Sequence, residues 1–167
     1  MWTRTISRPL LPLIPLLILS GAAVSQEMPP AVREEFLEMQ TKAGIITDAD
    51  ARYISSAWTT LEARAKSVGL SITKFHNTEG ESAGVDFSKK LTDGAAIAGS
   101  LKLHQDGVLA VTIRRDPIGP LQRKEVLDLL STGCLVGSRD KEKLLAKWDA
   151  TEGPEVTFSG QDPCKGK

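Results

Sequence analysis

Residues 95–115 read AAIAGSLKLHQDGVLAVTIRR, and this stretch decides the fold. Apolar and polar residues alternate on both sides of the segment 105–107, which is the pattern of two half-buried β-strands joined by a tight turn. Gly107 suits the left-handed position of a bulged three-residue turn, because glycine carries no Cβ. The sequence therefore predicts a β-hairpin over this stretch.

The register of this hairpin follows from its apolar residues. A three-residue loop at 105–107 sets Leu103 opposite Leu109 and Leu101 opposite Val111, so these side chains gather on one face. A two-residue turn would slip the pairing by one residue and scatter them over both faces. We therefore expect the three-residue loop, which also sets Gly99 opposite Ile113.

Two amphipathic helices are expected before the sheet. Pro29 and Pro30 suit the start of the first helix, and Gly44 suits its end. Thr47 can cap the second, which Gly69 would end. The predicted core-facing residues are Val32, Phe36, Met39 and Ala43 in the first helix, and Ile54, Trp58, Leu61, Ala65 and Val68 in the second. Joined by a short link, the two helices should pack as an antiparallel hairpin.

After the second helix, the spacing of the apolar residues changes from about four residues to two. Strands are expected at residues 70–75 and around Val85 and Phe87, with a loop at 76–82 between them. After the hairpin, Gly119 and Pro120 can start a helix that ends near Gly133. Ser138 can cap another helix, with Leu144, Leu145 and Trp148 on its apolar side, and residues 154–158 can form a last short strand.

This order of elements predicts an α+β fold with an antiparallel sheet of about four strands and two C-terminal helices. We expect residues 1–25 to be a signal peptide and residues 26–167 to be a single domain. Within that domain the helical hairpin takes residues 26–69, the sheet and its helices take 70–159, and 160–167 form a tail that is mobile except where Cys164 fastens it.

The first 25 residues have the three parts of a secretory signal peptide. Arg4 and Arg8 precede an apolar run at 9–19, and small residues around Ala23 and Ser25 suit a cleavage site. The run is shorter than the roughly 20 residues of a membrane span. An uncleaved N-terminal anchor is the alternative. The sequence thus predicts a periplasmic or secreted protein with no stable membrane span after cleavage.

The predicted compartment decides how the two cysteines are interpreted. Cys134 and Cys164 form an even pair, which in an oxidising environment predicts one disulfide. Neither a redox C-x-x-C motif nor the spacing of a zinc site occurs. The only asparagine, Asn77, is followed by Thr78 and Glu79 and does not fit the glycosylation pattern, which suits a bacterial envelope protein.

The charge of the chain argues against nucleic acid as a partner. The whole sequence has 21 basic and 21 acidic residues. Loss of the two arginines in residues 1–25 leaves 19 basic against 21 acidic residues, a net charge near −2. A nucleic-acid-binding domain would show a basic excess gathered on one face.

The sequence carries no catalytic or cofactor motif, and no cofactor or metal is expected. His76 and His104 are read as exposed loop or turn histidines. A hydrolytic site would need to combine one of them with carboxylates from the loops, for which Glu79, Glu81, Asp86 and Asp93 are available. Nothing in their spacing requires such a site.

A local basic patch is the best candidate for a contact surface. It consists of Arg114, Arg115, Arg123 and Lys124, at a strand end and a helix start. Such a patch can receive an acidic partner or an anionic ligand. Arg114 and Arg115 are the members that charge reversal would test.

Taken together, the sequence favours a small exported accessory protein that is not an enzyme and binds a protein partner in the cell envelope. Two alternatives stay open. One is a hydrolase of envelope polymers with a dispersed carboxylate and histidine site. The other is a carrier of a small apolar ligand, held in a cavity between the sheet and the helical hairpin.

Overall fold

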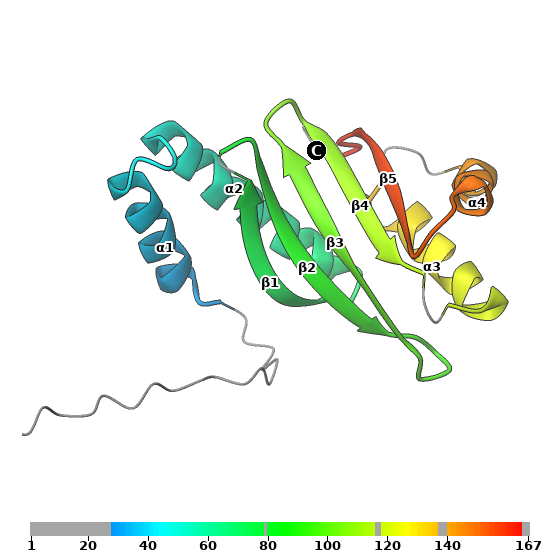
Figure 1. The fold of residues 1–167 in the computed structure, drawn as a ribbon. Helices are drawn as coiled ribbons and strands as arrows, with labels where there is room; N and C mark the ends of the chain where they lie inside the picture. Colours follow the sequence, from blue (N-terminus) through cyan, green and yellow to red (C-terminus); the bar gives the residue numbers. More distant parts are fainter. Residues whose placement is uncertain (1–27, 79, 116–117, 137–139, 165–167) are drawn as a thin grey trace, which may run out of the picture.

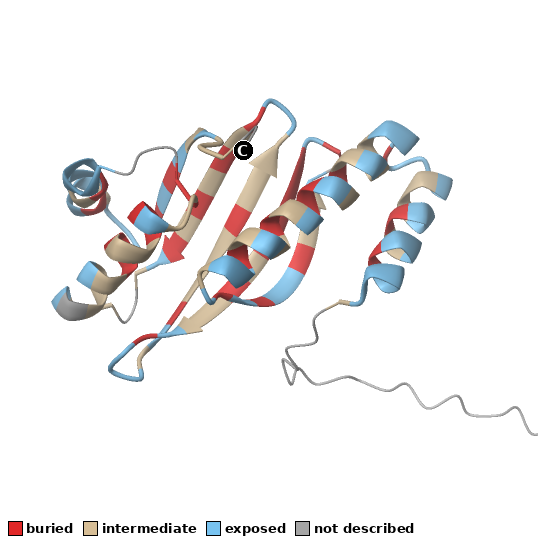
Figure 2. Ribbon diagram, turned by 180° about the vertical axis from the view of Figure 1, so that it is seen from behind, coloured by how far each residue is buried: buried red, intermediate tan, exposed pale blue. Residues whose placement is uncertain are grey.

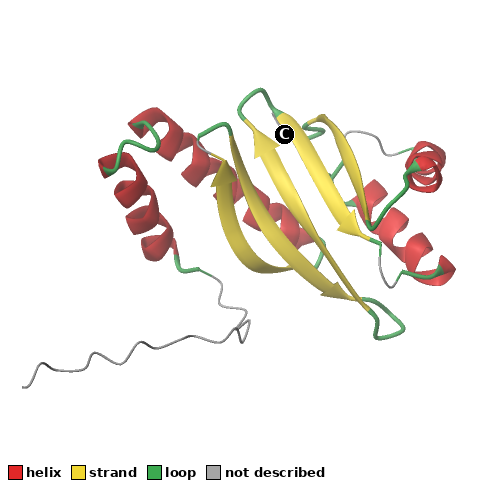
Figure 3. Cartoon of the chain, viewed as in Figure 1, coloured by secondary structure: helices red, strands yellow, loops and turns green. Residues whose placement is uncertain are grey.

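The chain folds into one antiparallel sheet with helices packed on one of its sides, as a computed structural model shows (Figures 1 and 3). The structure describes residues 28–78, 80–115, 118–136 and 140–164. The predicted signal peptide, Glu79 and Ser138 lie outside these residues.

The helices and strands follow the predicted order. They are α1 (Pro30–Lys42), α2 (Asp48–Ser67), β1 (Ser71–Thr78), β2 (Ser82–Lys90), β3 (Ala96–His104), β4 (Val108–Arg114), α3 (Pro120–Thr132), α4 (Lys141–Ala150) and β5 (Glu155–Gln161). The five strands lie in sequence order, β1-β2-β3-β4-β5. The predicted α+β class is confirmed, and the sheet has one strand more than the four expected, since the last short strand joins it.

The central hairpin has the predicted register. Leu103 pairs with Leu109, Leu101 pairs with Val111, and Gly99 pairs with Ile113. The turn places Gly107 at a φ of +86°, in the left-handed region that a bulged turn requires. The alternation of side chains thus directs Leu101, Val111 and their apolar neighbours to the same side of the sheet.

Helices α2 and α3 lie across that side, while α1 packs against α2 at one edge and α4 packs against α3 and β5 at the other (Figures 1 and 2). Helix α2 runs behind β1, β2 and β3, and its Trp58 is 1% exposed. Trp58 donates a hydrogen bond from Nε1 to the backbone oxygen of His76 (2.9 Å), and the Tyr53 hydroxyl donates to the backbone oxygen of Leu103 (2.8 Å). The opposite side of the sheet carries no helix, and we call it the bare face.

Helix α2 begins as its sequence predicts. Thr47 accepts a hydrogen bond from the Asp50 backbone nitrogen (3.1 Å), and Asp50 accepts one from the Thr47 backbone nitrogen (3.0 Å). This reciprocal pair is a capping box. Helix α4 is capped by Asp140, whose side chain accepts from the Glu142 backbone nitrogen (3.0 Å).

The prediction for helix α1 is wrong about which face is buried. Its buried residues are Arg33 and Leu37, whereas Val32 is 47% exposed and Met39 is 57% exposed. Phe36 is only partly buried and contacts Trp58 with ring centroids 6.4 Å apart. Val32 and Met39 therefore lie on the exposed side of α1, whereas Phe36 stays at the interface with α2 and an arginine joins it there.

One prediction about a loop is also wrong. Residues 76–78 belong to β1 rather than to a loop, so the first hairpin is longer than its apolar residues indicated. The described part of the tail is held in place. Gln161 pairs with Val108 in the sheet, and Asp162 forms an ion pair of 2.6 Å with Arg64, both side chains being largely buried.

The predicted disulfide between Cys134 and Cys164 is confirmed. It joins the residue after the C-cap of α3 to the segment that follows β5. Cys134 has a φ of +52°, a left-handed conformation that suits the end of a helix. The bridge therefore fastens the C-terminal segment to the helical side of the sheet.

The disulfide closes a sequence separation of 30 residues. We expect Cys134→Ser to lower the free energy of unfolding of the oxidised protein by about 3 kcal/mol, because the open chain gains entropy when unfolded. Cys164→Ser should cost the same, and the double variant no more, since one bond is lost in each case. Urea denaturation with and without reductant checks this, and equal stability of oxidised wild type and Cys134→Ser would contradict it.

Candidate functional site

The bare face has a floor of small side chains. Along β3 and β4, Ser100 and Thr112 pair with each other and alternate with the buried Leu101 and Val111, so they point away from the helices. The central residues of this floor are Gly84, Ala98, Ser100, Ala110 and Thr112. The floor is therefore flat and polar, with little apolar surface to bury.

Cationic side chains from neighbouring strands stand on this floor. Lys74 of β1, Lys90 of β2, Lys102 of β3 and Arg114 of β4 alternate with inward residues and share the bare face. Arg114 lies 4.0 Å from the Glu155 carboxylate, and both side chains are more than half exposed. Such an exposed pair contributes little to stability, so Arg114 can exchange its partner at low cost.

A shallow hollow of about 290 Å³ opens in the bare face. Its charged lining residues are Asp86, Arg114 and Glu155, and its hydroxyl groups come from Thr73, Ser100 and Thr112. Hydroxyl, carboxylate and guanidinium groups around one hollow can bind a polar group of a ligand through hydrogen bonds.

His76 and Asp86 meet beside this hollow. Nε2 of His76 lies 3.2 Å from Oδ1 of Asp86, and the imidazole ring lies against Gly84, where a Cβ would come within 2.1 Å of it. Burial lowers the pKa of His76 below its ordinary value, while the Asp86 charge opposes this shift and Lys102 adds to it. The ring is therefore neutral at neutral pH.

The second histidine shares the same face. His104 ends β3 and pairs with Ser82 of β2, so both histidines lie on strands rather than in separate loops. A further shallow hollow of about 360 Å³ lies beside His104 and is also lined by Asp50, Glu81 and Asp106. Among the described residues, no group of three or more histidine, cysteine or acidic side chains is arranged to hold a metal ion.

The predicted basic patch does not form one surface. Arg115 follows Arg114 in the chain but turns to the helical side, where its guanidinium lies 5.6 Å from the ring centre of Trp148. Its Nη1 donates to the backbone oxygens of Thr151 and, at 3.4 Å, Gly153. Arg115 thus fastens the connection between α4 and β5.

The other two predicted residues lie on α3. Arg123 forms a 2.8 Å ion pair with Asp149 of α4, which ties the two helices together. Lys124 is exposed and lines a hollow of about 450 Å³ between α3 and α4. Of the predicted patch, only Arg114 belongs to the bare face.

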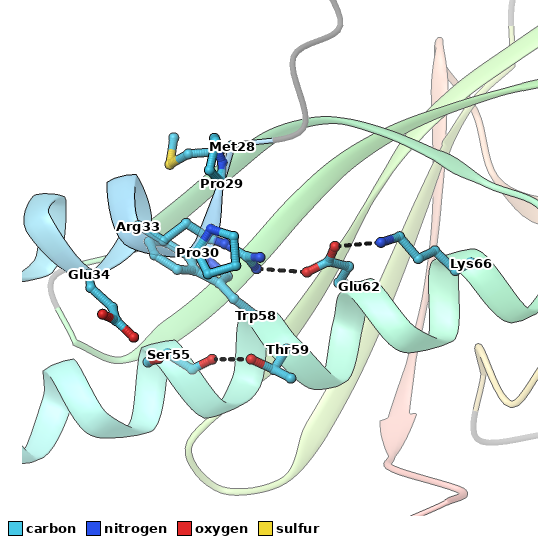
Figure 4. A pocket seen from close by; sticks show the side chains of 10 residues that line it. All are labelled: Met28, Pro29, Pro30, Arg33, Glu34, Ser55, Trp58, Thr59, Glu62 and Lys66. Carbon is cyan, nitrogen blue, oxygen red and sulfur yellow. Dashed lines mark hydrogen bonds and ion pairs between the residues drawn. The ribbon is translucent and has the colours of Figure 1, made fainter.

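A further hollow of about 550 Å³ lies between the start of α1 and α2 (Figure 4). Inside it, Glu62 accepts from Arg33 and from Lys66, each at 2.8 Å. The Arg33 guanidinium also lies 4.5 Å from the ring centre of Phe75, and its Nε is buried without a hydrogen-bond partner. These contacts hold α1 to the rest of the fold.

Sequence reasoning missed Lys74 and Lys102, and it named His76 and Asp86 as possible partners in a hydrolytic site without placing them side by side. The strand alternation that predicts the inward residues also predicts which residues point outward, and Lys102 lies between Leu101 and Leu103 in that pattern. His76 could not be found in this way, because residues 76–82 are polar and have no apolar alternation to mark a strand.

Comparison with known proteins finds no match for this chain. No family model matches the chain, and comparisons with curated proteins and with solved structures find no match either. In the described part of the chain, no helix is both long and apolar enough to span a bilayer.

The two neighbouring arginines should respond differently to truncation. We expect Arg115→Ala to lower the free energy of unfolding by about 1.5–3 kcal/mol, because hydrogen bonds from a charged group to backbone oxygens are lost. Arg114→Ala should change it by less than about 1 kcal/mol, since its ion pair is exposed. Urea denaturation of both variants measures this, and equal losses would contradict the assignment.

The stability of the fold should depend on His76 in mildly acid solution. Because the folded state lowers the pKa of His76 below 6.5, the unfolded chain binds the proton first as the pH falls. The contribution of neutral His76 to the free energy of unfolding is therefore fully present above pH 6.5 and is lost as the pH falls towards the lowered pKa. His76→Gln should flatten this part of the stability–pH curve measured by urea denaturation, and an unchanged slope would contradict the shift.

Proposed function

We propose that this chain is an exported, non-enzymatic protein that binds an acidic partner protein in the bacterial cell envelope through its bare face. The observation that supports this most is the sheet side that carries no described helix but presents cations from four neighbouring strands. A surface that is polar and extends over several strands suits a macromolecule better than a small ligand, which prefers a concave apolar pocket.

The compartment is supported by two independent features. The disulfide between Cys134 and Cys164 belongs to proteins that fold in an oxidising environment. Residues 1–25 have the composition of a secretory signal peptide. A periplasmic or secreted location accounts for both.

The chemistry of the partner follows from the side chains of the bare face. Lys74, Lys102 and Arg114 stand beside a floor of hydroxyl and methyl groups, and the cations outnumber the carboxylates Asp86 and Glu155. Apart from the rings of His76 and His104, no aromatic side chain of the described strands points to this side, so the face lacks the Phe, Tyr or Trp platform on which single-stranded nucleic acid stacks. An acidic protein surface provides the complementary charge.

A hydrolase is the second candidate, and one observation favours it. His76 and Asp86 lie 3.2 Å apart beside a polar hollow, which is the combination of histidine and carboxylate that a dispersed site would need. The neutral imidazole can act as a general base once a water or hydroxyl group lies next to its free nitrogen. Activity on envelope polymers that is lost in His76→Gln and in Asp86→Asn would support this candidate.

The carrier candidate has less support. The space between the sheet and α2 is filled by the side chains of Trp58, Ile54 and Leu61, which are almost fully buried. A ligand cavity at that place would require these side chains to move apart.

Charge reversal tests the proposed binding face. Lys74→Glu and Lys102→Glu should each abolish cross-linking of the exported chain to its envelope partner, and Arg114→Glu should do the same. Lys143→Glu is the matched control, because Lys143 is 78% exposed on α4 and makes the same change of charge away from the sheet. Binding to the partner should also weaken as salt screens the surface charges.

The cross-linking experiment has a clear contrary result. If the three face variants and Lys143→Glu all retain the same cross-linked partner, the bare face is not the binding surface. Melting curves of the face variants serve as the folding control. We expect them to match that of wild type, because the substituted side chains lie at the surface.

A further inference from the structure

The two edge strands of the sheet differ in how their outer edges are protected. At β1, the backbone oxygen of His76 accepts a hydrogen bond from Nε1 of Trp58 (2.9 Å), and a β-bulge lies between Ile72 and Lys74. Bulges, lysines and covering elements are the devices by which proteins keep an edge strand from pairing with another chain. The fold therefore closes the outer edge of β1.

Strand β5, at the other edge, has none of these devices. Its 7 residues, Glu155–Gln161, pair with β4 in a regular register without a bulge. They read EVTFSGQ, with a single charge at the first residue and neither lysine nor proline. Thr157 and Ser159 are exposed, whereas Thr112 of the neighbouring β4 is half-buried. An edge of this kind presents unpaired main-chain groups.

The hydrogen bonds at the two ends of β5 show which of its residues face outward. Before the strand, the Arg115 backbone nitrogen donates to the backbone oxygen of Pro154 (2.6 Å), and after it the Asp162 backbone nitrogen donates to that of Gly107 (2.9 Å). In an antiparallel pair, alternate residues direct both N–H and C=O to the same neighbour. The even-numbered residues of β5 therefore bind β4, and the odd-numbered residues turn N–H and C=O outward.

The outward main-chain groups define the chemistry of what can bind them. They belong to Glu155, Thr157, Ser159 and Gln161, none of which has a main-chain hydrogen bond to another described residue outside the sheet. Every second residue of a strand is about 6.8 Å further along, so donors and acceptors repeat at that spacing. Another extended backbone has the same repeat, and its groups match this edge.

The position of α4 decides between two extended occupants. Helix α4 lies beyond β5, farther from the middle of the sheet than the strand itself (Figures 1 and 2). A second copy that joined β5 to β5 by two-fold symmetry would bring its own α4 to the same side of the joint, where the two helices would meet. A single extended segment carries no such helix. The layout therefore favours a segment of a different protein.

We propose that β5 accepts an extended segment of another protein as a further, antiparallel strand of the sheet. Main-chain hydrogen bonds to the outward groups supply the contact, and the side chains of the segment set its selectivity. Val156 and Phe158 are buried on the helical side, so the residues opposite them are apolar. Opposite Thr157 and Ser159, hydroxyl and β-branched residues pair best.

This contact differs from the charge contact proposed for the bare face. It uses main-chain groups along one edge, whereas the bare face uses the side chains of Lys74, Lys102 and Arg114. The inference therefore goes beyond the proposed function and does not require it.

Hydrogen exchange of the exported, purified chain, followed residue by residue by NMR, tests the edge directly. The amides of Val156 and Phe158 should exchange slowly, because they bind β4. The amides of Thr157 and Ser159 should exchange at least tenfold faster. Equal protection at all four residues would show that the outer edge is already covered, and would overturn the proposal.

A peptide with the sequence of β4, VLAVTIR, is the probe, with two lysines at each end to keep it soluble. Strand β5 already pairs with this sequence on its inner edge, where Val111 lies opposite Phe158. At millimolar concentration the peptide should slow exchange of the Thr157 and Ser159 amides at least tenfold and leave the amides of β1 unchanged. The same peptide, N-methylated where its N–H groups would face β5, should have no effect. Equal effects of the two peptides, or none from either, would contradict strand addition.

Two variants separate the backbone from the side chain. Ser159→Pro removes an outward N–H but no bond to β4, and edge strands accept proline at such positions. It should melt like wild type and bind the peptide at least tenfold more weakly. Ser159→Ala, the matched control, keeps the N–H and should bind like wild type. Wild-type binding by Ser159→Pro would refute the proposal, and the N-methylated peptide makes the same comparison without changing the chain.

Lys102→Glu separates this inference from the proposed binding face. The variant changes the bare face but no outward group of β5, so the peptide should still slow exchange at Thr157 while cross-linking to the envelope partner is lost. A peptide without effect on wild type refutes strand addition and leaves the bare face to its own test. A retained envelope partner in Lys102→Glu refutes the binding face and leaves strand addition intact.

Discussion

The whole architecture depends on the one-sided burial of the β3–β4 hairpin. Leu101, Leu109, Val111 and Ile113 are all fully buried on the helical side. Each contributes about 1.5–3 kcal/mol when it leaves water, before entropy is subtracted. Because side chains alternate strictly along a strand, this burial forces Ser100, Thr112 and their neighbours to the opposite side. The bare face is thus a consequence of the same register that builds the core.

Helix α1 shows how one buried charge can override an apolar pattern. Arg33 reaches between Glu62 and the ring of Phe75. In this rotation of the helix, Leu37 and Phe36 pack inward while Val32 and Met39 are left exposed. A buried ion pair gains little net stability, since removing both charges from water is costly. Its effect here is on orientation, because Arg33 has partners in only one rotation of the helix.

The parts of the fold that were predicted correctly are those where several local rules agree. In the hairpin, the apolar alternation and the glycine turn give the same register, and at α2 the Thr47–Asp50 box agrees with the apolar stripe through Trp58. The rotation of α1 could not be predicted, because its cause is a contact between Arg33 and residues far along the chain. The separation of Arg114 from Arg115 differs from this, because strand alternation alone sends adjacent residues to opposite sides and could have divided the predicted patch.

The prediction of the site residues was least complete where the site depends on pairing between strands. Lys74, Lys102 and Arg114 are far apart in sequence and come onto one face only when the strands align side by side. His76 and Asp86 likewise meet across β1 and β2, and a β-bulge between Ile72 and Lys74 sets which residues of β1 face outward. Strand alternation gives the side of a residue, but the register of a polar edge strand needs the fold.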